Sequence, residues 1–315
     1  MKNANKKTVI AIVGPTASGK TSLSVELAKK LETEIISADS RQIYKEFDIA
    51  TAKPTQEEMQ DIKHNLMDFV EPTEDFTVAD FKDQATIVMT NLFKQDKTPI
   101  VVGGTGLYFR ILLENYDMPR VAPNKELREE LHKIEQEQGV DALYKMLVEL
   151  DPLAAQNMHP NNTVKIVRAL EVCKTLGIPM SEAQKVKADS EYNVIWFGLG
   201  HLNGEDRQIL YDRTDKRVDI MLEQGLENEA RALFEKYGRI QSLEKTIGYQ
   251  EFIDYFEAKK SYNEAVEQIK QNTRRYAKRQ LTWFRRNEDI HWLDITEPKS
   301  ILVEKCLKII DLSGQ

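Results

Sequence analysis

The sequence has 315 residues, of which 41% are hydrophobic and 30% are charged, and its formal net charge is −7. The hydrophobic fraction excludes a wholly disordered chain, and no apolar run approaches the roughly 20 residues that span a bilayer. Acidity argues against a nucleic-acid partner unless basic residues gather in one region. The two cysteines, Cys173 and Cys306, lie far apart without zinc-site spacing, so we expect buried thiols in a cytoplasmic protein.

The first predicted element is the strand Thr8–Val13, which runs into a glycine-rich loop and then a helix at residues 21–31. The loop matches the pattern G-x-x-x-x-G-K-[ST] of ATP- and other nucleotide-binding proteins, in its required place between a strand and a helix. Its backbone N–H groups, Lys20 and the Mg²⁺-binding hydroxyl of Thr21 predict a phosphate or diphosphate site. The motif leaves open whether the phosphate is transferred, hydrolysed or expelled. The predicted site is Gly14, Pro15, Thr16, Ala17, Ser18, Gly19, Lys20 and Thr21.

Further buried strands are predicted at residues 34–38, 99–102, 193–199 and 290–295, with a helix at 78–93. Strands that alternate with helices indicate an α/β fold, with a parallel sheet like that of P-loop NTPases and helices on both faces. Ligands of such sheets bind beyond the carboxyl ends of the strands. The P-loop, residues 39–44 and residues 103–108 each follow a strand, so we expect them to converge on one crevice.

The alternation stops near Pro119, and from residue 124 to about 187 the pattern is helical, with Leu127, Leu131 and Ile134 on one face. We therefore predict an all-helical insertion domain at 119–189, between the two parts of a core domain at 1–118 and 190–315. After the fourth strand, helices are predicted at 206–223, 226–237, 250–257 and 263–285.

Two polar segments at strand ends have alternative interpretations. Asp39, followed by Ser40, fits a general base or a carboxylate that holds Mg²⁺ through water, but it also fits an N-cap. The glycines before Thr105 allow a ligand to approach the backbone closely, but they also fit a plain strand-to-helix turn. A Walker-B strand usually ends in Asp, whereas the strand at 99–102 ends at glycine, which weakens an ATPase interpretation.

Basic residues gather in the C-terminal third. Arg213 and Arg217 lie four apart on one helix face, where they suit a diphosphate, although ion pairs with Asp212 or Asp215 are the alternative. Residues 262–286 hold seven Lys and Arg against two Glu, with Tyr276, Trp283 and Phe284 interleaved. This pattern fits RNA contacts with aromatic stacking, and a solvated basic face over core aromatics is the alternative. The central cations are Arg274, Arg275, Lys278 and Arg279.

Several blocks together resemble the tRNA dimethylallyltransferase (tRNA isopentenyltransferase) family, bacterial type. They are the P-loop, residues 39–44 (DSRQIY), 49–54 (IATAKP), 103–108 (GGTGLY), 167–172 (VRALEV), 215–218 (DKRV), 225–226 (GL), 247–249 (IGY) and 273–285. The resemblance covers almost the whole chain. It implies Mg²⁺-dependent transfer of a dimethylallyl group from dimethylallyl diphosphate to the exocyclic amine of the adenosine 3′-adjacent to the anticodon in tRNA. The P-loop then holds the diphosphate that leaves.

The resemblance also implies roles for particular residues. Asp39 is expected to accept the proton of the adenosine amine, while Thr105 and Arg217 complete the catalytic set and Thr16 helps to position diphosphate or base. The family usually carries Asn-Asp and then a basic residue in the run that begins at Asn161 here, whereas this chain departs from that pattern with Asn162 in place of the acid and Lys165 in place of Arg. The tRNA contacts implied are Asp39, Ser40, Arg41, Gln42, Thr105, Arg128, Asn161, Asn162, Thr163, Val164, Lys165, Arg274, Arg275, Lys278 and Arg279.

Two other functions remain open on the residues alone. A small-molecule P-loop kinase shares the loop and the strand-end Asp39, but it needs neither a basic aromatic helix nor a long helical insertion. A non-catalytic RNA-binding protein has no use for an intact Lys20, Thr21 and Asp39. We expect the anticodon stem-loop and dimethylallyl diphosphate as partners, no membrane partner, and a monomer.

Overall fold

The computed structural model describes residues 6–114, 116, 119–184, 190–200 and 207–314. The chain divides into two compact units, each with its own hydrophobic core: unit 1 is Met1–Leu113 with Glu191–Gln315, and unit 2 is Glu114–Ser190. The predicted domain limits at 118 and 189 lie outside the described residues. No helix in the described ranges is both long and apolar enough to cross a membrane.

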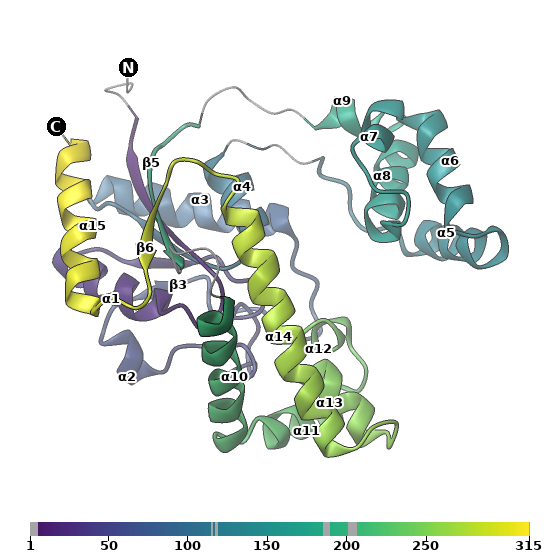
Figure 1. The fold of residues 1–315 in the computed structure, drawn as a ribbon. Helices are drawn as coiled ribbons and strands as arrows, with labels where there is room; N and C mark the ends of the chain where they lie inside the picture. The colour runs from purple at the N-terminus through teal and green to yellow at the C-terminus, as the bar shows by residue number, and fades with distance from the viewer. Residues whose placement is uncertain (1–5, 115, 117–118, 185–189, 201–206, 315) are drawn as a thin grey trace. The chain divides into compact units, whose positions relative to one another are not determined.

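Unit 1 is built on a six-stranded sheet in the order β3-β2-β4-β1-β5-β6, and every neighbouring pair is parallel (Figure 1). Ile10, in the central β1, lies opposite Ile100 and Ile195, and all three are buried because helices cover both faces. This confirms the predicted α/β fold. The strands are β1 (Thr8–Val13), β2 (Ile35–Ser37), β3 (His64–Asn65), β4 (Ile100–Gly103), β5 (Asn193–Gly200) and β6 (Ile290–Asp294).

The five predicted strands are present, each within one residue of its predicted ends. β3 was not predicted, since two residues are too short to show a periodicity. The helix α15 (Lys299–Gly314) was also missed, although its buried Leu302 and Cys306 are four residues apart on one face.

Two pairs of helices cover the sheet (Figure 1). On one side α1 (Lys20–Lys30) packs against α15, and their apolar side chains join those of the strands in one core. On the other side α3 (Val78–Lys94) packs against α4 (Gly106–Leu113), with the rings of Phe81 and Tyr108 stacked at 3.9 Å between centroids. The short α2 (Gln56–Met59) lies in the segment between β2 and β3.

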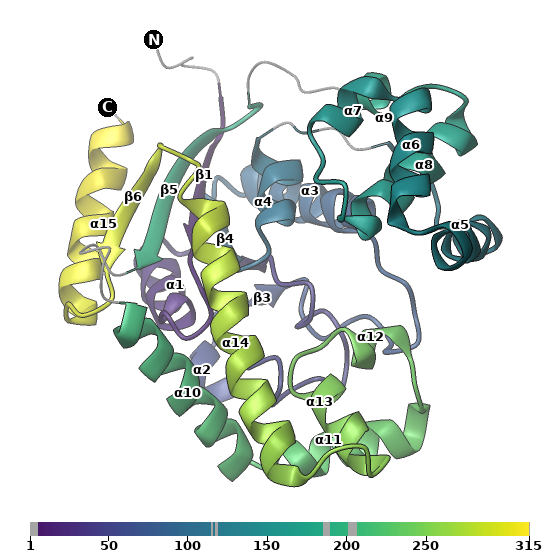
Figure 2. The same cartoon turned by 45° about the vertical axis from the view of Figure 1, so that its right-hand side comes forward.

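The C-terminal part of unit 1 adds a helical layer around a second core, which includes Phe47, Tyr249 and Phe252. Its long helix begins at an N-cap, Ser261, whose capping box with Glu264 satisfies the first free N–H groups. The two longest of these helices, α10 and α14, lie side by side (Figure 2). The predicted start of α10, residue 206, lies outside the described residues. The helices are α10 (Arg207–Glu223), α11 (Leu226–Tyr237), α12 (Gln241–Glu244), α13 (Tyr249–Phe256) and α14 (Tyr262–Phe284).

Unit 2 is helical in all its described elements, as the sequence pattern predicted. Leu131 of the predicted apolar face is fully buried, and Leu127 and Ile134 pack against the same core. Residues 185–187, the end of the predicted helical pattern, lie outside the described residues. The helices are α5 (Lys125–Gln138), α6 (Val140–Leu150), α7 (Pro152–Gln156), α8 (Thr163–Leu176) and α9 (Met180–Ala183).

Candidate active site

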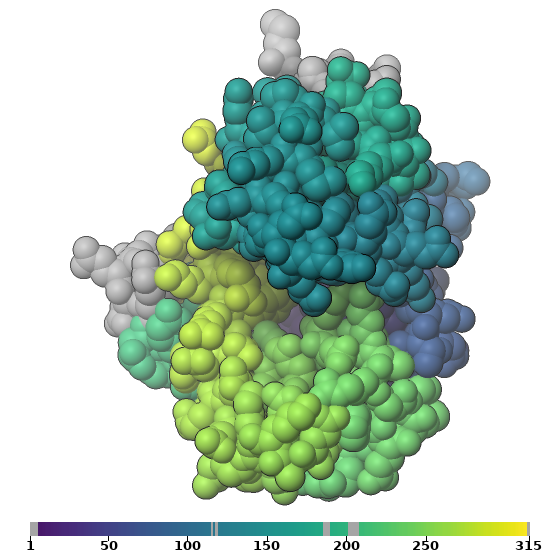
Figure 3. All heavy atoms as spheres, turned by 90° about the vertical axis from the view of Figure 1, so that its right-hand side faces the viewer, coloured from purple at the N-terminus to yellow at the C-terminus, as the bar shows by residue number. Residues whose placement is uncertain are grey.

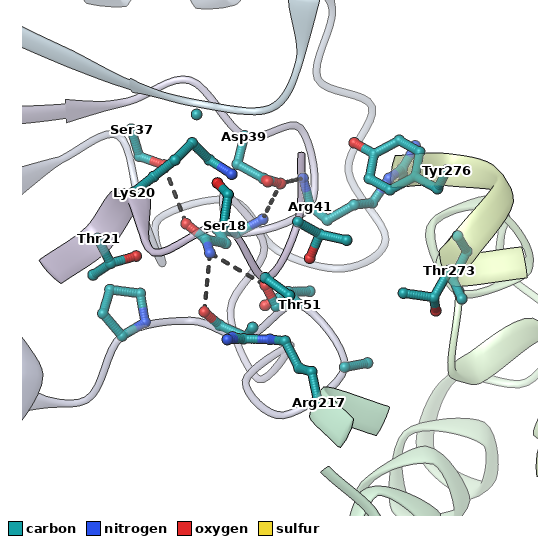
Figure 4. A pocket seen from close by; sticks show the side chains of 18 of the residues that line it. Ser18, Lys20, Thr21, Ser37, Asp39, Arg41, Thr51, Arg217, Thr273 and Tyr276 are labelled. Carbon is teal, nitrogen blue, oxygen red and sulfur yellow. Dashed lines mark hydrogen bonds between the residues drawn. The ribbon is translucent and has the colours of Figure 1, made fainter. Parts of the chain in front are cut away.

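A cavity of about 710 Å³ lies at the carboxyl ends of β1, β2 and β4, within unit 1. We call the side formed by the loops after these strands the strand-end wall, represented by Lys20, Asp39 and Gly103. The side formed by α10, the α12–α13 junction and α14 is the helical wall, represented by Arg217 and Gln280. The predicted convergence is confirmed for the P-loop and the start of residues 39–44 (Figure 4), whereas of residues 103–108 only Gly103 lines the cavity.

The P-loop presents unpartnered polar groups to this cavity. Gly19 has a φ of 92°, a left-handed conformation that favours glycine, and it precedes α1 without a side-chain cap. The first N–H groups of α1 therefore remain available at the positive end of the helix dipole. Ser18 is 2% exposed, and its buried Oγ has no hydrogen-bond partner among the described residues. Such an arrangement fits an anion whose oxygens accept these hydrogen bonds.

Lys20 lies at the base of the cavity, where its Nζ donates to the Pro15 carbonyl at 2.6 Å. Burial lowers the pKa of Lys20 to about 8, because the effect of Asp39, which raises it, is smaller than the cost of desolvating the ammonium. Arg217 lowers this pKa further. A bound diphosphate would reverse the shift, since anionic oxygens favour the charged ammonium.

Asp39 has two roles in one carboxyl group. Its Oδ1 accepts hydrogen bonds from the N–H groups of Arg41 at 2.8 Å and Gln42 at 3.3 Å, which holds the turn after β2. The N-cap-like interpretation is therefore correct for this oxygen. The other oxygen accepts no hydrogen bond from the part of the chain that the structure describes, and Asp39 lines the cavity (Figure 4). One oxygen fixes the side chain, and the other remains available for a proton.

Thr105 does not line the cavity itself but lies behind Ser40. Its Oγ1 accepts from the Ser40 N–H at 3.1 Å, and its own N–H donates to the Ala38 carbonyl at 3.2 Å. The hydroxyls of Ser40 and Thr105 are 3.4 Å apart. Thr105 thus joins the loop after β4 to the loop after β2, and we interpret it as a residue that orients the Asp39 segment.

The two arginines of the predicted pair, Arg213 and Arg217, make different contacts. Arg213 donates from Nε to the Ala17 carbonyl at 2.9 Å, so it holds the P-loop backbone. Arg217 extends from α10 into the cavity, and burial lowers its pKa (Figure 4). Its buried Nε lacks a partner in the described structure. The surface ion pairs considered for this pair are not formed, because Asp215 binds Arg274 and Asp212 accepts from Gln208.

Only part of the positive charge on α14 faces outward. Lys270 pairs with Asp219 at 2.6 Å and Arg274 pairs with Asp215 at 2.5 Å, so these two cations bind α14 to α10. Arg275 and Lys278 are exposed, and no acidic partner is found for them in the described ranges. Figure 3 shows the face of unit 1 that α11 to α14 form, in green to yellow.

The aromatic residues of α14 differ in their surroundings. Tyr276 lines the cavity, and Arg279 lies over its ring at 5.8 Å from the centroid. Trp283 is 37% exposed, and its indole packs against Gly106. Phe284 is buried against Phe109, so the expectation that it stacks on RNA bases is wrong. An amphipathic helix must turn one face to the core, and Phe284 lies on that face.

Sequence reasoning missed several residues of the helical wall. Gln280 is 5% exposed and binds both the P-loop and the loop after β4. The segment from Lys245 to Gly248 also lines the cavity, and the IGY block at 247–249 was a signal for it. His64 lines the cavity too, where burial lowers its pKa and its Nε2 has no partner among the described residues. The family block at 273–285 contains Gln280 but did not single it out, and no motif marked His64.

In unit 2, Arg128 forms a two-pronged ion pair with Glu171, at 2.8 Å from Nε to Oε1 and 2.9 Å from Nη2 to Oε2. Burial alone would raise the pKa of Glu171, but hydrogen bonds from Arg128 and Arg168 lower it. The Arg168 guanidinium also donates to the Val121 carbonyl at 3.0 Å. Arg128 therefore has a structural role within unit 2, and its predicted contact with tRNA stays a prediction.

The predicted tRNA-binding run of unit 2 lies at the start of α8. Asn162 is the N-cap, and its Oδ1 accepts from the Lys165 N–H at 3.3 Å. Thr163 donates to Glu135 at 3.1 Å. Asn161, Val164 and Lys165 are available on the outside, with Val164 81% exposed. The run thus presents a helix N-terminus and one cation, a suitable surface for a phosphate contact.

The chain is similar to proteins named tRNA dimethylallyltransferase along nearly its whole length. The family model described as IPP transferase matches residues 42–287. A tRNA dimethylallyltransferase of Bacillus cytotoxicus is 44% identical over 298 residues, which cover 94% of this chain and 93% of that protein.

Solved structures of proteins from the same family are also similar to this chain along most of its length. The full-length tRNA isopentenylpyrophosphate transferase of Bacillus halodurans has a TM-score of 0.73 at 40% identity, covering 98% of this chain and 97% of that one. A eukaryotic dimethylallyltransferase acting on tRNA has a TM-score of 0.75 at 31% identity, covering 92% and 74%. With this family match, identity and coverage, and with a P-loop cavity flanked by Asp39 and Arg217, the chain belongs to the IPP transferase family, whose members are tRNA dimethylallyltransferases.

Proposed function

We propose that the protein transfers a dimethylallyl group from dimethylallyl diphosphate to the exocyclic amine of the adenosine 3′-adjacent to the anticodon in tRNA. The observation that carries this proposal is that the anion-binding groups and Asp39 line one cavity. Ser18 Oγ and Arg217 Nε are buried there without partners in the described residues, and Asp39 lines the same cavity with one oxygen unused. The cavity thus has an anion-binding part and a proton-accepting group.

The anion-binding part suits a leaving diphosphate. As the allylic C–O bond breaks, negative charge grows on the bridging oxygen, and donors already in place stabilise it most effectively. Lys20 and the N–H groups at the start of α1 approach from the strand-end wall, and Arg217 approaches from the helical wall. No phosphoryl group is transferred, which accounts for a β4 strand that ends in glycine instead of a Walker-B acid.

Asp39 has the position and the free oxygen of a general base. The adenine amine is a poor nucleophile because its lone pair is delocalised into the ring, so removal of its proton assists attack. In the proposed step the amine nitrogen forms a bond to the allylic carbon and the C–O bond breaks. Diphosphate leaves with the electron pair, and the amine proton passes to Asp39. Thr105 and Ser40 hold the loop that carries Asp39 in place.

The adenosine must leave the anticodon-loop stack to reach the cavity. Arg41, Gln42 and Tyr276 line the cavity near Asp39, so they are suited to receive the extruded base (Figure 4). We propose that the outward cations of α14, Arg275 and Lys278, contact the RNA backbone. For unit 2 we propose that the start of α8 and the surroundings of Arg128 contact the anticodon stem-loop.

We propose Mg²⁺ as a cofactor held mainly by the diphosphate. In the part of the chain that the structure describes, no three acidic, His or Cys side chains form a metal site. The protein would contribute the hydroxyl of Thr21, which lines the cavity at the start of α1. This donor set fits Mg²⁺, which keeps several waters and binds through substrate phosphates. When bound, the ion would neutralise part of the diphosphate charge.

The test is a transfer assay with the full chain, Mg²⁺, labelled dimethylallyl diphosphate and unmodified tRNA. Label is expected in tRNA, with release of one diphosphate per label. A tRNA that carries guanosine at the target position is the matched control and should stay unlabelled. Consumption of ATP on a small acceptor, without label in tRNA, would overturn the proposal in favour of a small-molecule P-loop kinase.

A further inference from the structure

One buried side chain of α14 connects the two walls of the cavity. Gln280 is 5% exposed. Its Oε1 accepts from the Thr16 N–H at 2.9 Å, and its Nε2 donates to the Gly104 carbonyl at 3.1 Å. These partners belong to the P-loop and to the loop after β4, 264 and 176 residues away in the chain. A single carboxamide therefore satisfies two backbone groups of the strand-end wall from the helical wall.

The carboxamide lies directly against residue 104. A Cβ added to Gly104 would come 2.0 Å from Gln280 Nε2, so any side chain at this position would have to displace the end of the glutamine. The Thr16 N–H is directed at Gln280, which removes it from the groups that can face a diphosphate. The Pro15–Thr16 peptide of the P-loop is thus held by a side chain of another element, and its direction follows the position of α14.

The same helix also carries residues of the proposed RNA face. Tyr276 and Arg279, four residues and one residue before Gln280, line the cavity. α10 makes a second contact with the P-loop backbone, since Arg213 donates a hydrogen bond to the carbonyl of Ala17, the residue next to Thr16. Two adjacent residues of the P-loop, Thr16 and Ala17, are therefore bound through their backbone by two helices that also pair with each other through Arg274 and Asp215.

We propose that Gln280 is a positioning residue for the transfer reaction, an inference that rests on the proposed function. It fixes the Thr16 and Gly104 peptide groups relative to α14, so that the diphosphate and the adenosine bound along α14 meet in one geometry. Gln280 acts through these backbone groups and does not itself need to contact the reacting atoms.

The test replaces Gln280 with Met, which keeps the length and most of the volume of the side chain but has no hydrogen-bonding carboxamide. Gln271→Met, at an exposed position of the same helix, is the matched control. Four quantities are measured for each protein: the transfer rate at saturation, the Kd of inorganic diphosphate, the Kd of an anticodon stem-loop, and the Tm.

For Gln280→Met we expect a saturated transfer rate about 10- to 100-fold lower, the scale of effect that misplacing reacting groups produces. The Kd of inorganic diphosphate should rise, and the stem-loop Kd should stay within about twofold of wild type, because the cations of α14 are untouched. Wild-type transfer and wild-type diphosphate affinity, with only a lower Tm, would overturn the proposal and leave Gln280 a structural role.

A second variant covers the case in which Gln280→Met does not fold. Gly104→Ala keeps the glutamine but displaces its carboxamide, and it should reproduce both the slower transfer and the weaker diphosphate binding. Wild-type values of both in a folded Gly104→Ala protein would overturn the proposal. If wild-type protein transfers no label, the proposed function fails, and the diphosphate affinities still test the position of Gln280.

Discussion

The two walls of the cavity differ in how they supply their chemistry. The strand-end wall offers mainly backbone: the N–H groups at the start of α1, the turn held by Asp39, and the glycines after β4. The helical wall offers long side chains, chiefly Arg217 and Gln280, from segments almost 200 residues or more downstream of the P-loop. The comparison teaches that most donors of the phosphate site come from local chain geometry, whereas the direction of the P-loop peptides and their connection to the second substrate depend on packing between distant elements.

The largest expected effect lies in the strand-end wall. Asp39→Asn keeps an oxygen that can accept from the Arg41 and Gln42 N–H groups, so the turn survives, but it removes the proton acceptor. We expect single-turnover transfer to slow by about 10²- to 10⁴-fold, the usual contribution of a general base. The tRNA Kd should be nearly unchanged.

Asp39→Ala provides the companion measurement, because it also removes the oxygen that holds the turn. A full transfer rate in Asp39→Asn would refute the assignment of the base. A loss confined to Asp39→Ala would show instead that the turn is the only contribution of Asp39.

The second effect lies in the helical wall. Arg217→Gln removes a buried cation whose Nε has no hydrogen-bond partner among the described residues and that faces the proposed diphosphate. We expect the transfer rate to fall by about 10²- to 10³-fold, as when one charge-stabilising donor is lost. Arg213→Gln, which loses the bond to the Ala17 carbonyl, is the comparison and should cost less. Equal losses in rapid-quench assays would mean that both arginines act by holding the P-loop.

A third, smaller effect concerns the outer face of the helical wall. Arg275→Ala combined with Lys278→Ala should weaken tRNA binding about tenfold. The slope of log K against log salt should fall by about 1 to 2, because each phosphate that is no longer neutralised lowers it by about 1. Lys308→Ala, an exposed cation on α15, is the matched control. An unchanged salt slope in filter-binding or fluorescence titrations would remove α14 from the RNA interface.

The smallest expected effect is a pH dependence of diphosphate binding, caused by Lys20 of the strand-end wall. Because the pKa of Lys20 is lowered to about 8, the free protein loses this charge as the pH rises through 8. Diphosphate binds the charged form, so the affinity is highest well below pH 8, where nearly all Lys20 is charged, and it should fall roughly fivefold between pH 8 and pH 9. Calorimetry with inorganic diphosphate measures this, and Lys20→Arg, which stays charged, corrects for titration of the diphosphate. Parallel pH profiles for the two proteins would contradict the expectation.

The success of the sequence-based predictions also differs between the two walls of the cavity. The P-loop and Asp39 were readable because a short strand, a fixed spacing and a following helix are local properties. Arg217 was found by its spacing from Arg213, but only packing could separate a cavity residue from a surface ion pair. Gln280 lies in the family block at 273–285, but its contacts could not be predicted, because its partners are far away in the chain. Phe284 was misassigned, since interleaved aromatics do not show which face of a helix is buried.

The order of the strands has a consequence for synthesis. The central strand β1 pairs with β5, with Thr8 opposite Asn193, and β5 in turn pairs with β6 near residue 290. One of the two neighbours of the first strand is thus a segment made 185 residues later. Contacts of such long sequence separation form slowly. Unit 2 is one continuous stretch with its own core, so its folding can be complete on the ribosome while the first strand still waits for its partner.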